Sequence, residues 1–155
     1  MFLPVLGILA IVIWISEQSD TISETEENTT MALSPVDPNS YARTDLIKST
    51  HIHLDIDVDF DGKILDGHVV LSFEKLDAEA SSVVLDVRGL TIKNATLEET
   101  GQVLEYELGS PSGFGEKLEI KLPSSVGKEF KVRIGYKTSP NSTALQWLNP
   151  AQTAG

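Results

Sequence analysis

Polar and apolar residues alternate along residues 51–60, and this pattern restricts the possible folds more than any other feature of the chain. Successive side chains of a β-strand point to opposite faces, so the alternation predicts a strand with one buried face. The apolar face would carry Ile52, Leu54, Ile56, Val58 and Phe60, and the polar face His51, His53, Asp55, Asp57 and Asp59. Asp61-Gly62 follows, a dipeptide that tolerates the positive φ angles of a tight turn. Alternation resumes over residues 65–73, which predicts a β-hairpin.

Further short segments of strand character follow, separated by turn residues, at residues 82–87, 90–97, 103–108, 117–122 and 130–136. No helical period is convincing along this stretch, so the fold class predicted for residues 43–155 is all-β and mainly antiparallel. The tail over residues 142–155 has small and polar residues around Leu145, Trp147 and Leu148. Its pattern leaves a loop and a short strand both open.

The N-terminal residues 1–15 are almost entirely apolar. A run of roughly 15 apolar residues suits the core of a signal peptide better than a membrane span, which needs roughly 20. No Lys or Arg precedes Arg43, and Trp14 and Ile15 are too bulky for an ordinary cleavage site. A signal peptide and an uncleaved anchor therefore both stay open, as does an extension with no targeting role. Either targeting role would bring Phe2 to Ile15 into contact with a membrane.

Residues 16–42 combine acidic side chains with Ser, Thr, Pro35 and Pro38, and they show neither a strand period nor a helix period. This composition predicts a disordered acidic linker. Met31 lies within the linker and provides a second possible start. A product that begins at Met1 is expected in the secretory pathway or the membrane, and one that begins at Met31 in the cytoplasm.

The charge balance argues against nucleic acid as a partner. The chain has 23 acidic and 12 basic residues, which give a formal net charge of -11. A surface of this sign repels a phosphate backbone, so we expect no nucleic-acid binding. The sequence has 0 cysteines, which excludes disulfides, thiolate metal sites and cysteine nucleophiles.

Two patterns resemble metal sites without matching them. His51 and His53 share a strand face, and His68 on the next strand could supply a third zinc ligand. Residues 57–62 open like a calcium loop, but its twelfth position is His68 rather than a bidentate Glu. The simpler interpretation is the wetter face of a sheet, so we predict no metal, cofactor or catalytic residue in this chain. If the chain is secreted, the acceptor triplets predict glycosylation at Asn28, Asn94 and Asn141.

Three stretches of residues 43–155 carry a family resemblance. They are residues 51–60, residues 85–92, and residues 138–155 with the string Leu145-Gln146-Trp147-Leu148. These residues resemble the N-terminal domain of the zinc aminopeptidase family that includes leukotriene A(4) hydrolase and aminopeptidases B and N, with leukotriene A(4) hydrolase as the nearest likeness. The resemblance implies a saddle-like β-domain, here incomplete, that packs against the catalytic and helical domains of its own full-length chain.

The same resemblance implies what the chain lacks. Such enzymes bind zinc through H-E-x-x-H and a later Glu, and they hold the substrate amine with G-x-M-E-N; neither motif occurs in this sequence. The chain is therefore expected to be truncated before the catalytic domain and inactive alone. Its full-length parent would bind zinc and remove N-terminal residues from peptides. It would also hydrolyse an epoxide if it acts like leukotriene A(4) hydrolase. The alternative is a stand-alone secreted or membrane-tethered β-domain that serves as a binding module.

Overall fold

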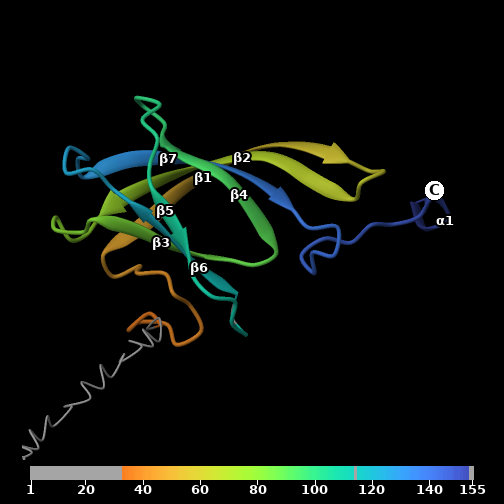
Figure 1. Cartoon of the computed structure of the whole chain (residues 1–155), viewed down its shortest axis with the longest axis horizontal. Helices are drawn as coiled ribbons and strands as arrows, with labels where there is room; N and C mark the ends of the chain where they lie inside the picture. Colours follow the sequence, from red (N-terminus) through yellow and green to blue (C-terminus); the bar gives the residue numbers. More distant parts are fainter. Residues whose placement is uncertain (1–32, 114, 154–155) are drawn as a thin grey trace, which may run out of the picture.

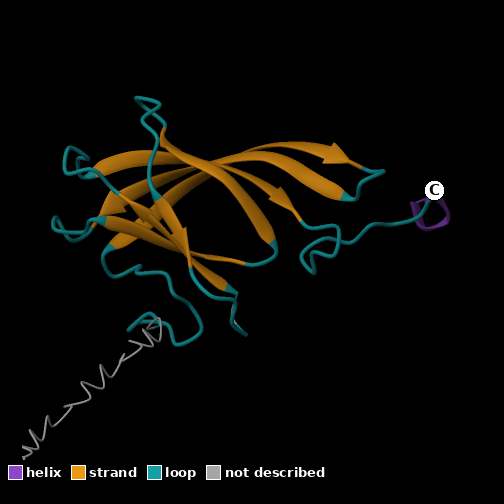
Figure 2. Ribbon diagram, viewed as in Figure 1, coloured by secondary structure: helices purple, strands orange, loops and turns teal. Residues whose placement is uncertain are grey.

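The computed structural model describes residues 33–113 and 115–153, and within them seven strands form two antiparallel sheets. The larger sheet has the order β1 (Ile47–Asp59), β2 (Ile64–Lys75), β7 (Glu129–Thr138) and β4 (Leu90–Leu97). The smaller sheet has the order β3 (Ser82–Val87), β6 (Glu116–Lys121) and β5 (Tyr106–Leu108). The two sheets lie one above the other (Figures 1 and 2).

The predicted all-β antiparallel class is confirmed. Every segment predicted as a strand contains one, although β5 is shorter than expected and occupies only Tyr106–Leu108. Val103 forms an isolated bridge with Thr96 instead of extending β5. In the tail, which the sequence left open between a loop and a strand, the chain forms a loop and one helical turn, α1 (Pro150–Thr153).

The predicted hairpin consists of β1 and β2, and its register places Ile52 opposite Leu71. The turn between them differs from the prediction in one respect. Its positive φ of 53° falls on Lys63, whereas Gly62 has an ordinary φ. Gly62 instead donates its backbone N–H to Asp59 Oδ1 at 2.8 Å, so the carboxylate that ends β1 closes the turn.

The core lies between the two sheets and closes along the β4 and β5 side. Its members are buried side chains from both layers, among them Phe73, Val83, Ala95, Leu118, Ile120, Phe130, Val132 and Ile134. Phe73 and Phe130 stack with ring centroids 5.5 Å apart. Across the closed side, Tyr106 Oη donates to the carbonyl oxygen of Ile92 at 3.2 Å, which ties the smaller sheet to the larger.

The burial predicted for the first strand is wrong. The apolar side chains of β1 do share one face, but Ile52 is 58% exposed and Leu54 is 55% exposed. The exposure follows from the edge position of β1, because Leu71, which lies opposite Ile52 in β2, is buried. The tip of the β1–β2 hairpin also projects past the smaller sheet (Figure 1). The alternation set the direction of these side chains correctly, but no layer covers them in the described part of the chain.

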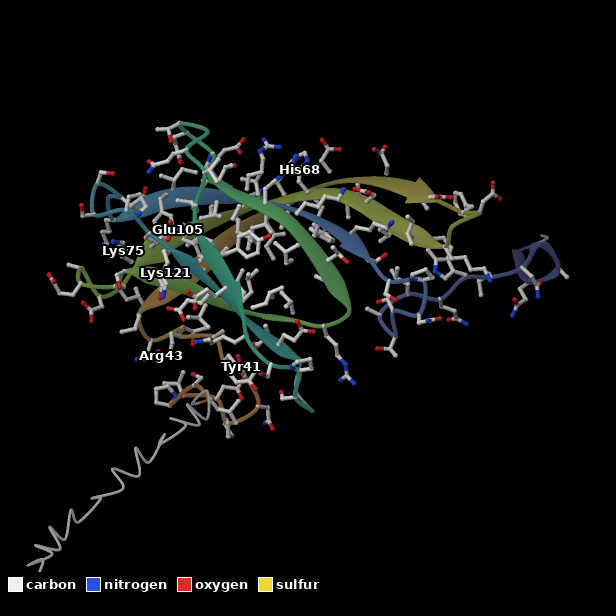
Figure 3. The ribbon with its side chains drawn as sticks, in the orientation of Figure 1. Tyr41, Arg43, His68, Lys75, Glu105 and Lys121 are labelled. Atoms are coloured by element: carbon white, nitrogen blue, oxygen red, sulfur yellow. The ribbon has the colours of Figure 1, made fainter. Side chains whose placement is uncertain are left out.

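Residues 33–42, which the sequence assigns to the linker, pack against the smaller sheet. Ser40 Oγ donates to Asp86 Oδ2 at 2.5 Å, and the backbone N–H of Tyr41 donates to Asp86 Oδ1 at 2.8 Å. Tyr41 is buried, and its hydroxyl donates to Ser112 Oγ at 2.9 Å. Figure 3 places Tyr41 below the smaller sheet, so this segment holds β3 to the loop that precedes β6.

Several predictions fall outside the described residues. They are the hydrophobic segment at residues 1–15, linker residues 16–32 with Met31, and the acceptor Asn28. The other two acceptors, Asn94 and Asn141, are both exposed. Within residues 33–113 and 115–153 no helix has the length and apolar character needed to cross a membrane.

Candidate docking surface

The outer face of the larger sheet carries a polar hollow of about 410 Å³. It is lined by His51, His53, Asp55, His68, Val70, Ser72, Glu98, Lys131 and Arg133. Figure 3 shows His68 on the side of the larger sheet that faces away from the smaller one. The alternation predicted that three of these lining residues, His51, His53 and Asp55, share a face, and the structure does bring His51, His53 and His68 to one surface.

An ion-pair ladder crosses this face. Arg133 donates from Nε and Nη2 to the two carboxylate oxygens of Glu98, both at 2.6 Å, and this bidentate pair holds the pKa of Glu98 below its usual range. Arg133 Nη1 also contacts His68 Nε2, and that nitrogen lies 3.8 Å from Asp55 Oδ2. Because its pKa is lowered, Glu98 stays ionised at neutral pH and is not suited to act as a general acid or a general base.

Zinc does not fit these residues. Among residues 33–113 and 115–153 no group of three His, Asp or Glu side chains is placed to hold a metal ion. His68 Nε2 is engaged with Arg133, so the suggested third ligand does not converge with His51 and His53. The calcium-like run fits no better, because Asp57 and Asp59 lie on the extended strand β1 rather than in a loop, and Asp59 closes the turn.

The opposite face of the larger sheet opens as an apolar cavity of about 490 Å³ between the two sheets, which we name the β1 groove. It is lined by Ala42, Ile52, Leu54, Val69, Leu71, Leu85, Asp86, Val87, Leu90, Ile92, Leu118, Ile134 and Tyr136. Its one carboxylate, Asp86, already accepts hydrogen bonds from Ser40 and Tyr41. Burial raises the pKa of Tyr136. A surface with this lining favours contact with apolar groups.

The rim of the β1 groove is an open sheet edge. β1 pairs with β2 on one side and with no described strand on the other, and its 13 residues leave a long row of backbone groups along that edge. The apolar stripe along the same strand is exposed at Ile52, Leu54, Val58 and Phe60. Long, apolar edge strands are the form of edge that readily accepts another strand.

The stripe ends at the tip of the hairpin, where the C-terminal tail returns to meet it. Phe60 and Trp147 pack edge to face with ring centroids 5.9 Å apart. The indole N–H of Trp147 is buried and has no acceptor among the described residues. A buried donor without an acceptor costs stability, so this contact is favourable in its apolar part and incomplete in its polar part.

Comparison with known proteins decides the family. No family profile matches the sequence. Leukotriene A-4 hydrolase of Xenopus laevis is 39% identical over 122 residues, which cover 77% of this chain and 20% of that protein. Leucine aminopeptidase 2 of Aspergillus oryzae is 36% identical over 129 residues, which cover 81% of this chain and 21% of that protein.

The chain belongs to the leukotriene A-4 hydrolase and leucine aminopeptidase 2 family. It corresponds to the N-terminal domain of those proteins and spans about one fifth of their length, 20% and 21% for the two relatives. The solved structure of yeast LTA4 hydrolase in complex with bestatin superposes with a TM-score of 0.68 at 25% identity, over 77% of this chain and 19% of that one. The family resemblance inferred from the sequence is thus confirmed.

The sequence found the polar face of this family domain but missed its open apolar groove. The groove combines side chains from both sheets, such as Leu85 of β3 and Leu118 of β6. A local sequence pattern does not predict that these residues line the same cavity as Leu54 of β1. One signal was available. The alternating hairpin is longer than any later strand, since β1 has 13 residues while β3 and β6 have 6 each.

Proposed function

We propose that this chain is the non-catalytic N-terminal scaffold domain of a zinc metalloaminopeptidase, and that the remainder of such an enzyme packs on its β1 groove. The parent protein would remove N-terminal residues from peptides, and it would also hydrolyse an epoxide if it acts like a leukotriene A-4 hydrolase, the name of its Xenopus relative. In that protein the domain would position the catalytic domain and wall off part of its substrate cleft.

The single observation that carries this proposal is an apolar surface left open on a domain whose relatives are about five times longer, the match covering 20% of the Xenopus protein. Half-exposed Ile52 and Leu54 border a cavity of about 490 Å³, and burying one such side chain contributes about 1.5–3 kcal/mol. The donor of Trp147 points to the same conclusion, because a docked domain would supply the missing acceptor.

The polar groups of the domain support a structural role rather than chemistry. Lys117 and Lys121 donate to Glu119 at 2.8 and 3.0 Å and lower its pKa to about 2. Glu74 is paired in the same manner with Lys48 and Lys128, and its pKa is also lowered. The Glu74 pairs tie β2 to β1 and to the residue before β7, whereas the Glu119 pairs lie within β6. The zinc of the parent would be bound elsewhere and would supply the Lewis-acid chemistry there.

A chimera tests the scaffold role. Residues 33–155 would replace the matching N-terminal domain of Xenopus laevis leukotriene A-4 hydrolase, and bound zinc and release of an amino acid from an aminoacyl anilide would be measured. We expect the chimera to bind zinc and to cleave the anilide. The 155-residue chain alone should release nothing with zinc present. Zinc-dependent release by the chain alone, or a chimera that binds zinc but cleaves nothing, contradicts the proposal.

A matched pair of variants locates the docking surface. Leu54→Asp would place a charge in the β1 groove of the chimera, and Val103→Asp would place one at a position that is 75% exposed and does not line the groove. We expect Leu54→Asp to lower both the melting temperature and the aminopeptidase activity, because an unpaired charge would be buried. Val103→Asp should leave both unchanged. Equal effects of the two substitutions would reject the groove as the docking surface.

A second candidate function, a stand-alone binding module, is favoured by one observation: the two sheets already enclose a core of fully buried side chains such as Val132 and Ile120. Residues 31–155 can be expressed alone to separate the candidates. A soluble monomer with two-state unfolding favours the binding module. A scaffold domain separated from the rest of its aminopeptidase should instead self-associate through the open edge of β1.

We further infer that a product started at Met1 enters the secretory pathway and is glycosylated. Asn94 and Asn141 are exposed and stand in acceptor triplets, which supports modification at both. Expression in animal cells followed by glycosidase treatment would test this, with Asn94→Gln and Asn141→Gln each expected to remove one glycan. A product that glycosidase does not shift would favour the cytoplasmic form started at Met31.

A further inference from the structure

We propose that two copies of the 155-residue chain pair through their β1 strands, antiparallel, about a two-fold axis that passes through Leu54. The partner is a second copy of the same chain, so this inference goes beyond the proposed scaffold role, which concerns the remainder of an aminopeptidase. Pairing would join the two larger sheets into one continuous sheet. The open edge of β1 supplies the backbone groups for that joint.

The charge order along β1 selects this register. In an antiparallel pair centred on Leu54, residues at equal distances on either side of it face each other. His53 then lies opposite Asp55 of the second copy, and His51 lies opposite Asp57. By symmetry each of these cross-strand pairs occurs twice. An imidazole N–H can donate a hydrogen bond to a facing carboxylate, whereas like charges directly opposite are destabilising.

The neighbouring registers lack this complementarity. Centring the pair on His53 would place His53 against itself, and centring it on Asp55 would place Asp55 against itself. The second arrangement brings acidic groups together in a chain whose net charge is already -11. Only the register centred on Leu54 sets an imidazole against a carboxylate at every polar position between residues 51 and 57.

The apolar face of β1 agrees with the same axis. Leu54 would meet Leu54 of the second copy, and Ile52 would meet Ile56. Because Ile52 is 58% and Leu54 55% exposed, this contact covers side chains that the described residues of the single chain leave open. The irregularity between Ser49 and His51 interrupts the regular strand, so pairing of uninterrupted strand is limited to residues 51–57.

Disulfide trapping tests the axis. The chain has 0 cysteines, so Leu54→Cys in the full 155-residue chain introduces a single thiol on the proposed axis. Residues directly opposite in an antiparallel pair have Cα atoms about 4.5–5.5 Å apart, a separation that a disulfide can span. We expect mild oxidation to give a reducible dimer. Val103→Cys is the control, because its position is 75% exposed but lies away from β1.

Contact between copies through residues 1–15 would affect both variants alike, so the ratio of the two yields isolates β1. We expect Leu54→Cys to cross-link at least about tenfold faster than Val103→Cys. Equal rates overturn the proposal. The scaffold role is tested separately in the chimera, where no second copy is needed, so either idea can fail while the other stands.

A charge exchange tests the register. In the Leu54→Cys background, His53→Asp sets Asp against Asp55 of the second copy, and Asp55→Lys sets Lys against His53. His53→Asp alone should cross-link roughly threefold to thirtyfold more slowly, because symmetry creates two Asp–Asp pairs, and Asp55→Lys alone should also be slower because both imidazole–carboxylate pairs are lost. Mixing the two variants restores Asp against Lys and Asp against His, so the mixed dimer should dominate. Unchanged rates, or a random mixture of dimers, reject this register and with it the proposed pairing.

Discussion

Strands β1 and β7 belong to the same sheet and show the same alternation, yet their apolar faces have opposite fates. Val132 of β7 is 0% exposed and Ile134 is 3% exposed, whereas Ile52 of β1 is 58% exposed. The difference lies in the position within the sheet, because β7 is an interior strand between β2 and β4, whereas β1 is an edge strand. Periodicity therefore fixes which way a side chain points, and the position of its strand in the sheet decides whether it is buried.

Strand length accounts for the mismatch between the layers. β1 has 13 residues and β2 has 12, whereas β3 and β6 have 6 each. At about 3.3 Å per residue the hairpin is roughly 40 Å long and the smaller sheet roughly 20 Å. The smaller sheet therefore cannot reach the tip of the hairpin, where Val58 and Phe60 are exposed. Ile52 lies level with buried Leu71 and Val132, so its exposure follows from the edge position of β1.

The largest effect expected from this difference comes from one substitution made in both regions. Ile120→Ala removes a side chain that is 0% exposed in β6 and should lower the free energy of unfolding by about 2–5 kcal/mol. Ile52→Ala makes the same change at a half-exposed position of β1 and should cost less than about 1 kcal/mol at concentrations too low for two copies to pair. Urea unfolding of the two variants gives both values. Equal losses would mean that β1 is covered in solution.

A glycine tests how closely β1 depends on β2. A Cβ at Gly67 would lie 2.1 Å from the backbone oxygen of Asp55, so Gly67→Ala should force the strands apart and cost about 1–3 kcal/mol. Hydrogen exchange should speed up along β1 while the core of the other strands stays protected. Gly127→Ala is the control, since nothing lies within 4 Å of its added Cβ. Loss of protection throughout would show that the hairpin and the sandwich unfold as one unit.

The sequence predicted most of the fold because each strand is indicated by the pattern of its own residues and of the turn next to it. Alternation and turn residues placed all the strands, and the polar face with His51, His53 and His68 was found as one surface. The apolar groove was not found, because it depends on how far the β3–β6–β5 layer extends beneath Leu54. The position of the positive φ at Lys63 was missed for a similar reason: Asp59 closes the turn around Gly62 in an ordinary conformation.

Acid should weaken the covered region through Glu119 of β6. Lys117 and Lys121 lower its pKa from 4.5 to about 2, so this carboxylate adds stability above pH 4.5 and loses it as pH falls towards 2. With solvent screening the contribution is about 1–2 kcal/mol. Glu119→Gln should therefore be less stable than the natural chain at pH 6, and the difference should shrink at pH 3. A constant difference in urea midpoints between the two pH values would exclude this linkage.

The smallest effect is expected at the uncovered end of the hairpin. Phe60 is 75% exposed and touches Trp147 only edge to face, so Phe60→Ala should change the free energy of unfolding by less than about 0.5 kcal/mol. The substitution should nevertheless release the tail, because that ring contact joins Trp147 to the hairpin. A Trp14→Phe background leaves Trp147 as the sole tryptophan of the 2 in the chain, so its emission reports the tail alone.

We expect Phe60→Ala to shift that emission to longer wavelength and to raise quenching by iodide, with the urea midpoint unchanged. Leu148→Ala is the matched control, since Leu148 is also exposed in the tail but has no ring to stack on Phe60. If the midpoint falls as far as it does for Ile120→Ala, the tip of the hairpin is part of the cooperative core. The contrast between covered and uncovered regions would then apply only to the middle of β1, where Ile52 and Leu54 lie.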